Sequence, residues 1–332
     1  MNRLLVISER YWPDGSGGEL ATHLIIGLLK DHFNITVVTG SKNIARHNGV
    51  DYIYEPLLSK REKHILWPNT VRLVSKEWFE RLLQEADVVY IPRFAFPIIP
   101  RAKKLGKKVV VHLHDYIPIS YTAVVLAPYE EHRNRIMLDN MMLECMKGLK
   151  HCISYALTWW IPNIARKWVS QADKIICVSK RQATIISDTA PELADKIEVV
   201  YNPLSLELTT ANYVKSLSET PTFLYLGGDS YIKGINLIVI AARQLRSAGL
   251  KARIIATGIY SKHTASILTQ HGNVEIVGKV KYGKVMELYK SAWATLFPSL
   301  WEETYGYVVV ESMATGTIPI ASKVGGVPEV TE

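Results

Sequence analysis

Short runs of β-branched and other apolar residues recur along the chain, and each is followed by a stretch compatible with a helix. Strands that alternate with helices form parallel sheets covered on both faces. The pattern therefore predicts a doubly wound α/β domain in the first part of the chain. Its strands are expected at 3–8, 34–40, 87–92, 107–115, 173–179 and 196–202.

The same alternation restarts after residue 220 and predicts a second doubly wound domain. Between the two patterns, residues 204–220 have no strong period and many small polar side chains, as is typical of a connection. We predict a Rossmann-like domain at 1–203, a linker at 204–220 and a Rossmann-like domain at 221–332. The second domain's strands are expected at 222–228, 251–258, 273–278, 293–299 and 317–322, and its helices near 234–245, 285–290 and 306–315.

Residues 120–171 have no strand pattern, and we expect partly exposed helices there. They contain three tryptophans among basic residues: Trp159, Trp160 and Trp168 among Lys147, Lys150, Arg166 and Lys167. Two interpretations stay open. The helices dock on an anionic membrane surface, or the tryptophans are buried against the domain core.

Composition fits a two-domain protein that stays in water. The chain has 332 residues, of which 48% are apolar and 21% charged, and its formal net charge is +8. The excess lies mainly in residues 1–203, which hold 27 Lys and Arg against 21 Asp and Glu. A basic surface of this kind suits anionic small molecules, acidic lipid or weak nucleic-acid binding.

Neither the N-terminus nor the cysteines indicate export. The first residues lack the apolar core and cleavage site of a signal peptide. The apolar stretch 152–164 is interrupted by Pro162 and is shorter than the roughly 20 residues that cross a bilayer. Three cysteines form no complete set of pairs and no CxxC, so we expect free buried thiols in a reducing cytosol. They are Cys145, Cys152 and Cys177.

Two candidate sites follow strands of the first domain, where ligands bind in open α/β sheets. The sequence YWPDGSGGE places Gly17 and Gly18 in a flexible loop that enters a helix, and such loops approach phosphate closely. After KKVVVHL comes His114, which is suited to hydrogen bonding or proton transfer near neutral pH. His112 two residues earlier would permit a metal, but no third ligand is apparent. Each feature alone is also compatible with a structural role.

Two further candidates follow strands of the second domain. Lys233 in DSYIKG lies at the start of a helix, where its charge would add to the helix dipole at a diphosphate. In WEETYGYVVVES, Glu303 and Glu311 flank the start of another helix at Gly306. One sugar-diphosphate-nucleoside would span them, with sugar hydroxyls on Glu303, diphosphate at Gly306 and ribose on Glu311. Taken alone, these residues would also fit an ordinary helix surface.

These motifs together resemble glycosyltransferase family 4, whose members are retaining enzymes of the GT-B fold. The segment EETYGYVVVESMATGTIPIASKVGGVPEV resembles the family's E-x7-E segment. The resemblance covers nearly the whole chain, because further motifs follow in the family's order and spacing. They are PDGSGGE, VVVHLHD, ADKIICVSK, KIEVVYNP and LYLGGDSYIKG.

The resemblance implies a donor held mostly by the second domain and an acceptor held mostly by the first, with closure of a cleft between them. It implies metal-independent transfer with retention, and no cofactor besides the nucleotide-diphosphate sugar that serves as donor. His114, Lys233 and Glu303 take the catalytic roles. The expected donor-binding residues are Gly17, Gly18, Gly228, Lys233, Glu303, Tyr305, Gly306, Tyr307 and Glu311.

Two features depart from the family pattern. Gly228 stands where the family usually has an arginine that acts with the lysine. The chain stops at Glu332, so we expect the second domain to be truncated and the helix that usually crosses back to the first domain to be absent.

The expected function is transfer of a hexose from a nucleotide sugar to a lipid-linked or polysaccharide acceptor. The expected location is cytoplasmic, with peripheral contact at the cytoplasmic face of an anionic membrane. A non-catalytic subunit that binds a nucleotide sugar or a partner is the alternative that Gly228 and the early stop favour. An epimerase is also compatible with the fold. Specific nucleic-acid binding is not expected, because no recognition module is present.

Overall fold

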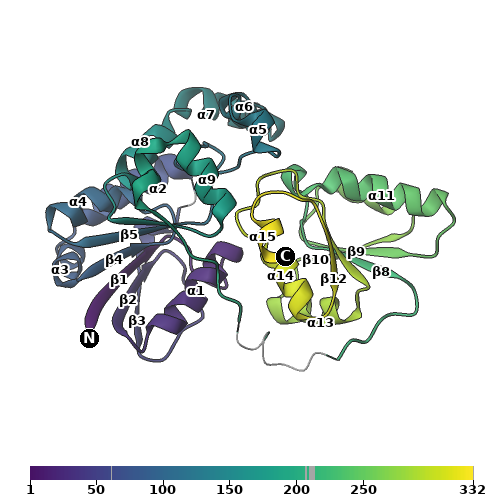
Figure 1. Cartoon of the computed structure of the whole chain (residues 1–332), viewed down its shortest axis with the longest axis horizontal. Coiled ribbons are helices and arrows are strands. Elements are labelled where there is room, and N and C mark those ends of the chain that lie inside the picture. Colours follow the sequence, from purple (N-terminus) through teal and green to yellow (C-terminus); the bar gives the residue numbers. More distant parts are fainter. Residues whose placement is uncertain (61, 206–207, 209–213, 332) are drawn as a thin grey trace. The chain divides into compact units, whose positions relative to one another are not determined.

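The computed structural model describes residues 1–60, 62–205, 208 and 214–331, and it divides into two compact units. The first unit comprises Met1–Val125 and His132–Pro203, and the second comprises Leu126–Glu131 and Leu204–Glu332. Each unit is an α/β structure built on one parallel sheet (Figure 1). Of the predicted linker, residues 206, 207 and 209–213 lie outside the described residues.

The first unit contains a seven-stranded parallel sheet among its described residues, in the order β3-β2-β1-β4-β5-β6-β7. All six predicted runs form strands, whereas β3 was not predicted. Its residues are only half-buried or exposed, because it lies at the edge of the sheet and carries a mixed sequence, VDYIY. The strands are β1 (Asn2–Ser8), β2 (Phe33–Thr39), β3 (Val50–Tyr54), β4 (Val88–Ile91), β5 (Lys108–Leu113), β6 (Lys174–Cys177) and β7 (Ile197–Val199).

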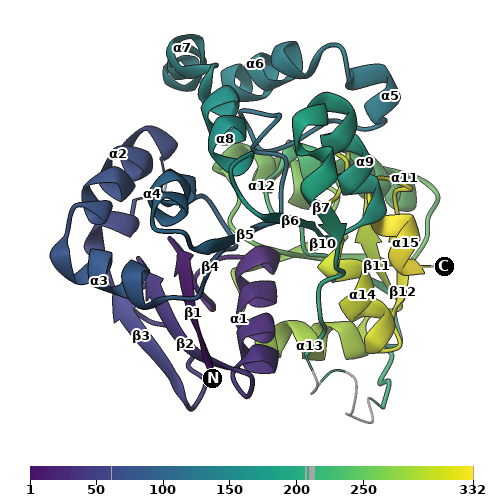
Figure 2. The ribbon, with the colours of Figure 1, turned by 60° about the vertical axis from the view of Figure 1, so that its left-hand side comes forward.

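Helices cover both faces of this sheet, with α1 on one face and α2, α3 and α4 on the other (Figure 2). Alternate residues of β1 serve the two faces, so Leu4 and Val6 pack with Ile26 of α1 while Leu5 and Ile7 point the opposite way. The whole run is therefore buried. The helices are α1 (Gly17–Leu29), α2 (Lys63–Val74), α3 (Glu77–Glu85), α4 (Ile99–Lys104), α6 (Ile136–Met146), α7 (Leu149–Thr158), α8 (Ile161–Val169) and α9 (Lys180–Thr189).

The second unit contains a five-stranded parallel sheet in the order β10-β9-β8-β11-β12. Tyr225 and Ile254 pack with α11 and α12 on one face, whereas Leu224 and Ile255 pack with α13 on the other. The strands are β8 (Thr222–Tyr225), β9 (Arg253–Thr257), β10 (Val274–Gly278), β11 (Ala294–Phe297) and β12 (Ile318–Ala321). The helices are α11 (Ile235–Ser247), α12 (Lys262–Thr269), α13 (Tyr282–Ser291), α14 (Tyr307–Ala314) and α15 (Val327–Thr331).

The prediction that residues 1–203 form one unbroken domain is wrong at residues 126–131. This segment, which enters α5 (Tyr129–His132), belongs to the second unit. Leu126 pairs with Trp301 in an antiparallel bridge, and the Ala127 N–H donates to the Leu300 carbonyl. These backbone contacts attach the segment to the loop that follows β11. Sequence periodicity cannot reveal this contact, because residues 126–128 form no helix and make only an isolated bridge to a distant residue.

The expectation of three free thiols is also wrong. Cys145 and Cys152 form a disulfide across the turn between α6 and α7, and the buried Cys177 is the free cysteine. The helices expected in residues 120–171 are present as α5 to α8. Trp159 and Trp160 are exposed, whereas Trp168 packs edge-on against the ring of Trp67. No helix in the described part of the chain is both long and apolar enough to span a membrane.

Candidate functional site

Glu303 lies in the loop between β11 and α14, and its carboxylate accepts three side-chain hydrogen bonds. The side chain is 4% exposed. Its Oε1 accepts from Ser299 Oγ at 2.5 Å, from Trp301 Nε1 at 2.7 Å and from Lys233 Nζ at 2.6 Å. These donors hold a buried negative charge at the carboxyl edge of the sheet, where ligands of such folds bind.

Lys233 approaches Glu303 from the turn before α11. Its ammonium group also lies over the ring of Trp301, 5.0 Å from the centroid, and the side chain keeps 31% of its surface exposed. The turn depends on Gly234, which has a φ of 75°. A Cβ at this position would lie 1.9 Å from the Pro298 carbonyl oxygen. The close approach of these two loops brings Lys233 and Glu303 together.

The carboxylate of Glu302 fixes the backbone around Glu303, a role that the sequence did not suggest. Glu302 is 2% exposed, and it accepts from the Tyr129 N–H at 2.6 Å and from the Gly325 N–H at 2.9 Å. It therefore ties segment 126–131 to the loop after β12. In the sequence, the only sign of this role is that Glu302 is a second glutamate directly beside Glu303 in WEET.

The loop after β12 packs directly on the backbone of Glu303. The Gly326 N–H donates to the Glu303 carbonyl at 2.7 Å. Gly325 has a φ of 57°, and a Cβ there would lie 2.0 Å from the Glu303 carbonyl oxygen. Glycine is thus required at this position both by the left-handed backbone and by the contact.

The amino end of α14 begins at Gly306, as predicted. Gly306 adopts a φ of 93° as the N-cap, and the following backbone N–H groups start the helix at Tyr307. The rings of Tyr305 and Tyr307 meet edge-on with centroids 5.2 Å apart. Gly316, just after the helix, adopts a φ of 71°. This helix start offers backbone donors and a positive dipole end.

Glu311 faces α13 from the middle of α14. Its carboxyl group accepts from Tyr282 OH at 2.7 Å and from Tyr289 OH at 3.3 Å. Burial raises the pKa of Glu311 to about 7, although both hydroxyls act in the opposite direction. Glu311 therefore changes its charge near neutral pH.

Gly228 lies in the loop after β8, beside a small pocket. It has a φ of 63°, a conformation that an arginine would adopt only with strain. The buried Tyr225 donates from its hydroxyl to the carbonyls of Gly228 and Lys233. The pocket has a volume of about 80 Å³ and is lined by Tyr225, Leu226, Gly227, Lys233, Leu296, Phe297, Ser299 and Val308.

The predicted residues of the first unit lie together at the carboxyl edge of its own sheet. His114 follows β5, and a Cβ on Gly18 of α1 would lie 3.2 Å from the His114 Cβ. Burial, with His112 and Arg93 nearby, lowers the pKa of His114 well below its ordinary value. The imidazole is therefore neutral at pH 7. Gly17 is the first residue of α1.

A buried charge cluster supports this edge and was not predicted. Arg93 binds Glu9 through Nε at 3.1 Å and Glu19 through Nη1 at 3.2 Å. Glu19 also accepts from the Ser16 N–H at 2.8 Å and so caps α1. The sequence SGGE has the S-x-x-E pattern of a capping box, which could have revealed this role of Glu19. The described residues contain no group of three His, Cys, Asp or Glu side chains arranged as metal ligands.

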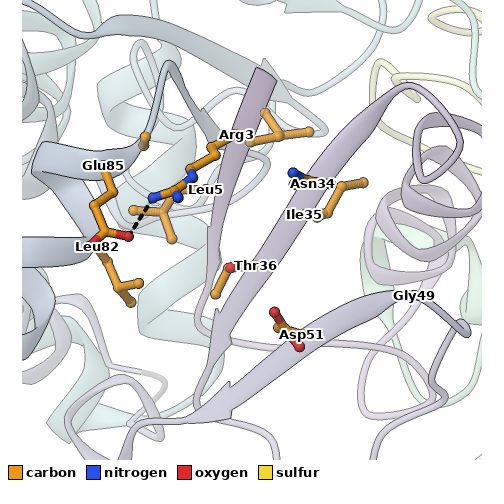
Figure 3. A pocket seen from close by; sticks show the side chains of 11 residues that line it. Arg3, Leu5, Asn34, Ile35, Thr36, Gly49, Asp51, Leu82 and Glu85 are labelled. Carbon is orange, nitrogen blue, oxygen red and sulfur yellow. Dashed lines mark hydrogen bonds and ion pairs between the residues drawn. The ribbon is translucent and has the colours of Figure 1, made fainter. Parts of the chain in front are cut away.

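A larger pocket lies at the opposite, amino ends of β1, β2 and β3 (Figure 3). Its volume is about 400 Å³, and its wall includes Arg3, Asn34, Asp51 and Glu85. Arg3 and Glu85 form an ion pair at 2.6 Å, but both side chains are 56% exposed. Ligands of doubly wound sheets bind at the carboxyl ends of strands, so this pocket is not the candidate site.

Two family models match the chain and together cover most of it. The model "Glycosyltransferase Family 4" matches residues 17–208, more than half of the chain, and "Glycosyl transferases group 1" matches residues 212–332. A protein of Klebsiella pneumoniae described as an uncharacterized 42.6 kDa protein in cps region is 24% identical. That alignment covers 99% of this chain and 87% of the relative.

Solved structures show the same fold. Anabaena HepE in complex with UDP-glucose superposes with a TM-score of 0.70 at 18% identity, over 99% of this chain and 83% of that one. WaaG, described as a glycosyltransferase involved in lipopolysaccharide biosynthesis, superposes with a TM-score of 0.69 at 13% identity, over 98% of this chain and 83% of that one. The fold of the chain is thus GT-B, as the resemblance implied.

Proposed function

Because the chain belongs to glycosyltransferase family 4, transfer of a glycosyl group is its class of reaction, and we propose that it moves a hexose from a nucleotide-diphosphate sugar. The proposed transfer retains the configuration at the anomeric carbon. The proposed acceptor is lipid-linked or a polysaccharide, at the cytoplasmic face of a membrane.

The observation that carries this proposal is the ion pair of Lys233 with the buried Glu303, both within the second unit that also holds the start of α14. In the proposed complex, hydroxyls of the donor sugar bind Glu303. The diphosphate binds Lys233 and the backbone N–H groups near Gly306, and the ribose binds Glu311. Lys233 must turn from Glu303 toward the diphosphate when the donor enters.

The proposed reaction breaks the bond between the anomeric carbon and the diphosphate oxygen, and the electron pair leaves with the diphosphate. The acceptor hydroxyl oxygen forms the new bond from the same face, and its proton passes to the departing diphosphate oxygen. Lys233 and the helix start supply positive charge to the leaving group, so we assign this role to the protein rather than to a metal. One well-placed donor of this kind contributes roughly 3 to 4 kcal/mol.

We assign the remaining predicted residues to the donor as well. The neutral imidazole of His114 would hydrogen-bond the donor sugar, and Gly17 and Gly18 would allow backbone approach to phosphate. Gly228 would leave Lys233 as the main cation, since it stands where the family has arginine. Tyr305 and Tyr307 would flank the diphosphate at the helix start.

The proposed acceptor and location rest on two observations. WaaG, which has the same fold, is involved in lipopolysaccharide biosynthesis, and the first half of the chain carries most of the net positive charge. The cysteines do not support a cytosolic location, because Cys145 and Cys152 form a disulfide. The cytoplasmic location is proposed from the nucleotide-sugar donor.

The direct test is a thermal-shift screen of the full chain against UDP-, GDP-, ADP- and CDP-sugars. A ligand that binds only the native state raises its stability by RT ln(1 + [L]/Kd). We expect one nucleotide class to raise the Tm, and we expect Glu311→Ala to abolish the shift. If no nucleotide sugar raises the Tm of the wild-type chain, the proposal that the chain binds such a donor is wrong.

The second candidate is a non-catalytic subunit that binds a nucleotide sugar or a partner. It is favoured by Gly228, which replaces the family's arginine in a backbone conformation that an arginine would adopt only with strain. The donor identified by the screen separates the two. Hydrolysis of that donor to the free nucleoside diphosphate, lost in Lys233→Ala, supports the enzyme. Donor binding without any Lys233-dependent turnover supports the subunit.

A further inference from the structure

We propose that the α6–α7 hairpin, residues 136–158, is a membrane-binding element that inserts its apolar faces into an anionic lipid surface. The inference deepens the membrane location of the proposed function and rests on that part of it. It does not require donor binding. In both overall views α6 and α7 lie together, beyond the helices that cover the sheet of the first unit (Figures 1 and 2).

The exposed face of α6 is apolar, unlike that of an ordinary helix on a protein surface. Its buried face mixes the apolar Ile136 and Leu143 with the polar Asp139, Asn140 and Glu144. Its exposed face carries four large apolar side chains with exposed fractions of 37% to 57%, namely Met137, Leu138, Met141 and Met142. A helix on a water-exposed surface turns its apolar stripe to the core, so this arrangement suits an apolar environment outside the protein.

Hydrogen bonds fix the buried polar face of α6. Asn140 Oδ1 accepts from Ser120 Oγ at 2.9 Å, and Asp139 accepts from His132 at 2.7 Å. Asn140 Oδ1 also accepts from the Thr122 N–H at 3.1 Å. A rotation of α6 that buried its methionines would break these bonds, which makes the outward apolar face a fixed property of the fold.

α7 adds a second apolar stripe beside the first. Leu149, Ile153 and Leu157 recur every fourth residue, so they share one face of the helix. They are 75%, 53% and 70% exposed. The opposite face holds the buried Tyr155, whose hydroxyl donates to the Met137 carbonyl at 2.7 Å and joins the two helices. The Cys145–Cys152 disulfide closes the turn between them.

Tryptophans and basic residues at the margin indicate a lipid surface rather than another protein copy. Trp159 and Trp160, directly after α7, are 48% and 43% exposed, and tryptophan favours the membrane interface. Residues 133–170 contain six Lys and Arg but two Asp and Glu, and both acids are buried. Anionic headgroups complement this charge. A symmetric contact between two copies would instead bring the basic side chains together.

The stripes run along both helices, so the hairpin would lie in the plane of the interface with its basic side chains directed to the headgroups. Lys147 and Lys150 at the turn would contact anionic lipid while Leu149 enters the acyl region. The free energy of binding would have two contributions. The attraction between basic side chains and anionic lipid is screened by salt, whereas the burial of apolar side chains is not.

Flotation of the full chain with phosphatidylcholine vesicles, with and without 30% phosphatidylglycerol, tests the proposal. We compare wild type with the triple variant Leu149→Ser, Ile153→Ser, Leu157→Ser. The matched control replaces three apolar residues of similar exposure elsewhere: Leu28→Ser, Val71→Ser and Leu250→Ser, at 57%, 52% and 59% exposure. We expect the hairpin variant to lose about tenfold or more in vesicle affinity and the control to bind like wild type.

Three outcomes overturn the proposal. In the first, the wild type does not float with anionic vesicles. In the second, the two triple variants bind the vesicles equally well. In the third, brominated lipid does not quench the tryptophan emission of the wild type and 0.5 M NaCl abolishes its binding entirely. The last outcome means surface adsorption by charge alone. Loss of a wild-type dimer in the hairpin variant, without vesicle binding, assigns the surface to a second copy instead. Nucleotide-sugar thermal shifts, measured on the same variants, report failure of the donor site separately.

Discussion

At the scale of single residues, the carboxyl group of Glu311 gives the candidate donor site a dependence on pH. Burial raises its pKa to about 7 from an ordinary 4.5. A ribose hydroxyl donates more strongly to an ionised carboxylate than to a neutral one. Nucleotide-sugar affinity should therefore rise as the pH increases from 6 to 8. Isothermal titration with a nucleotide sugar, whose diphosphate does not titrate in this range, should show the rise in wild type and a flat profile in Glu311→Gln.

The same group should affect stability in the opposite direction. Between pH 4.5 and 7 the folded chain holds a proton on Glu311 that the unfolded chain has lost, so the free energy of unfolding falls as the pH rises through this range. The full difference is about 3 kcal/mol. Denaturant unfolding of Glu311→Gln should lack this contribution. An identical pH profile for wild type and variant would show that Glu311 titrates normally.

Gly325 tests whether the backbone position of Glu303 controls donor binding. Gly325→Ala places a Cβ 2.0 Å from the Glu303 carbonyl oxygen at a φ of 57°, so we expect the nucleotide-sugar thermal shift to disappear. Gly272→Ala is the matched control, because its φ is 71° and a Cβ there has no atom within 4 Å. It should lower stability by about 1 kcal/mol through backbone strain and leave the shift intact. Equal behaviour of the two variants would contradict the role of the contact.

At the scale of elements, segment 126–131 and the loops at β11 and β12 form one assembly through Glu302. Glu302→Ala removes the acceptor of the Tyr129 and Gly325 N–H groups, at a cost of about 3 kcal/mol for bonds to a buried charge. Hydrogen-exchange mass spectrometry should show faster exchange in residues 126–131 and around 325. Glu275→Ala, an exposed glutamate of the same unit, should leave both segments protected. Unchanged hydrogen exchange in Glu302→Ala would show that this carboxylate does not hold the three segments together.

Elements also show where sequence patterns were sufficient. The buried strands were predicted because apolar residues on both faces make continuous runs, as in Leu4–Ile7. The edge strand β3 was missed because its outer side faces solvent and its sequence is mixed. The start of α14 near Gly306 was predicted from the alternation of strands and helices. The outward apolar face of α6 was not predicted, because a helical period of apolar residues does not say which face is buried.

At the scale of the whole molecule, donor binding should protect residues of both units if the predicted site is correct. We expect slower hydrogen exchange at 303–311 and 231–235 in the second unit, and at 17–22 and 112–116 in the first, when a saturating nucleotide sugar is present. Lys233→Ala should abolish all of this protection at the same concentration. Protection confined to the second unit would exclude His114, Gly17 and Gly18 from the donor site.

The sequence by itself determined two alternating α/β patterns, the family motifs and most residues of the candidate site, because periodicity and glycine chemistry are local properties. Only the tertiary structure decided which distant groups meet. It paired Lys233 with Glu303, joined Arg93 to Glu9 and Glu19, and assigned residues 126–131 to the second unit. It also placed Glu311 where burial raises its pKa. Contact and desolvation arise from neighbours far along the chain, so they exist only once the chain is folded.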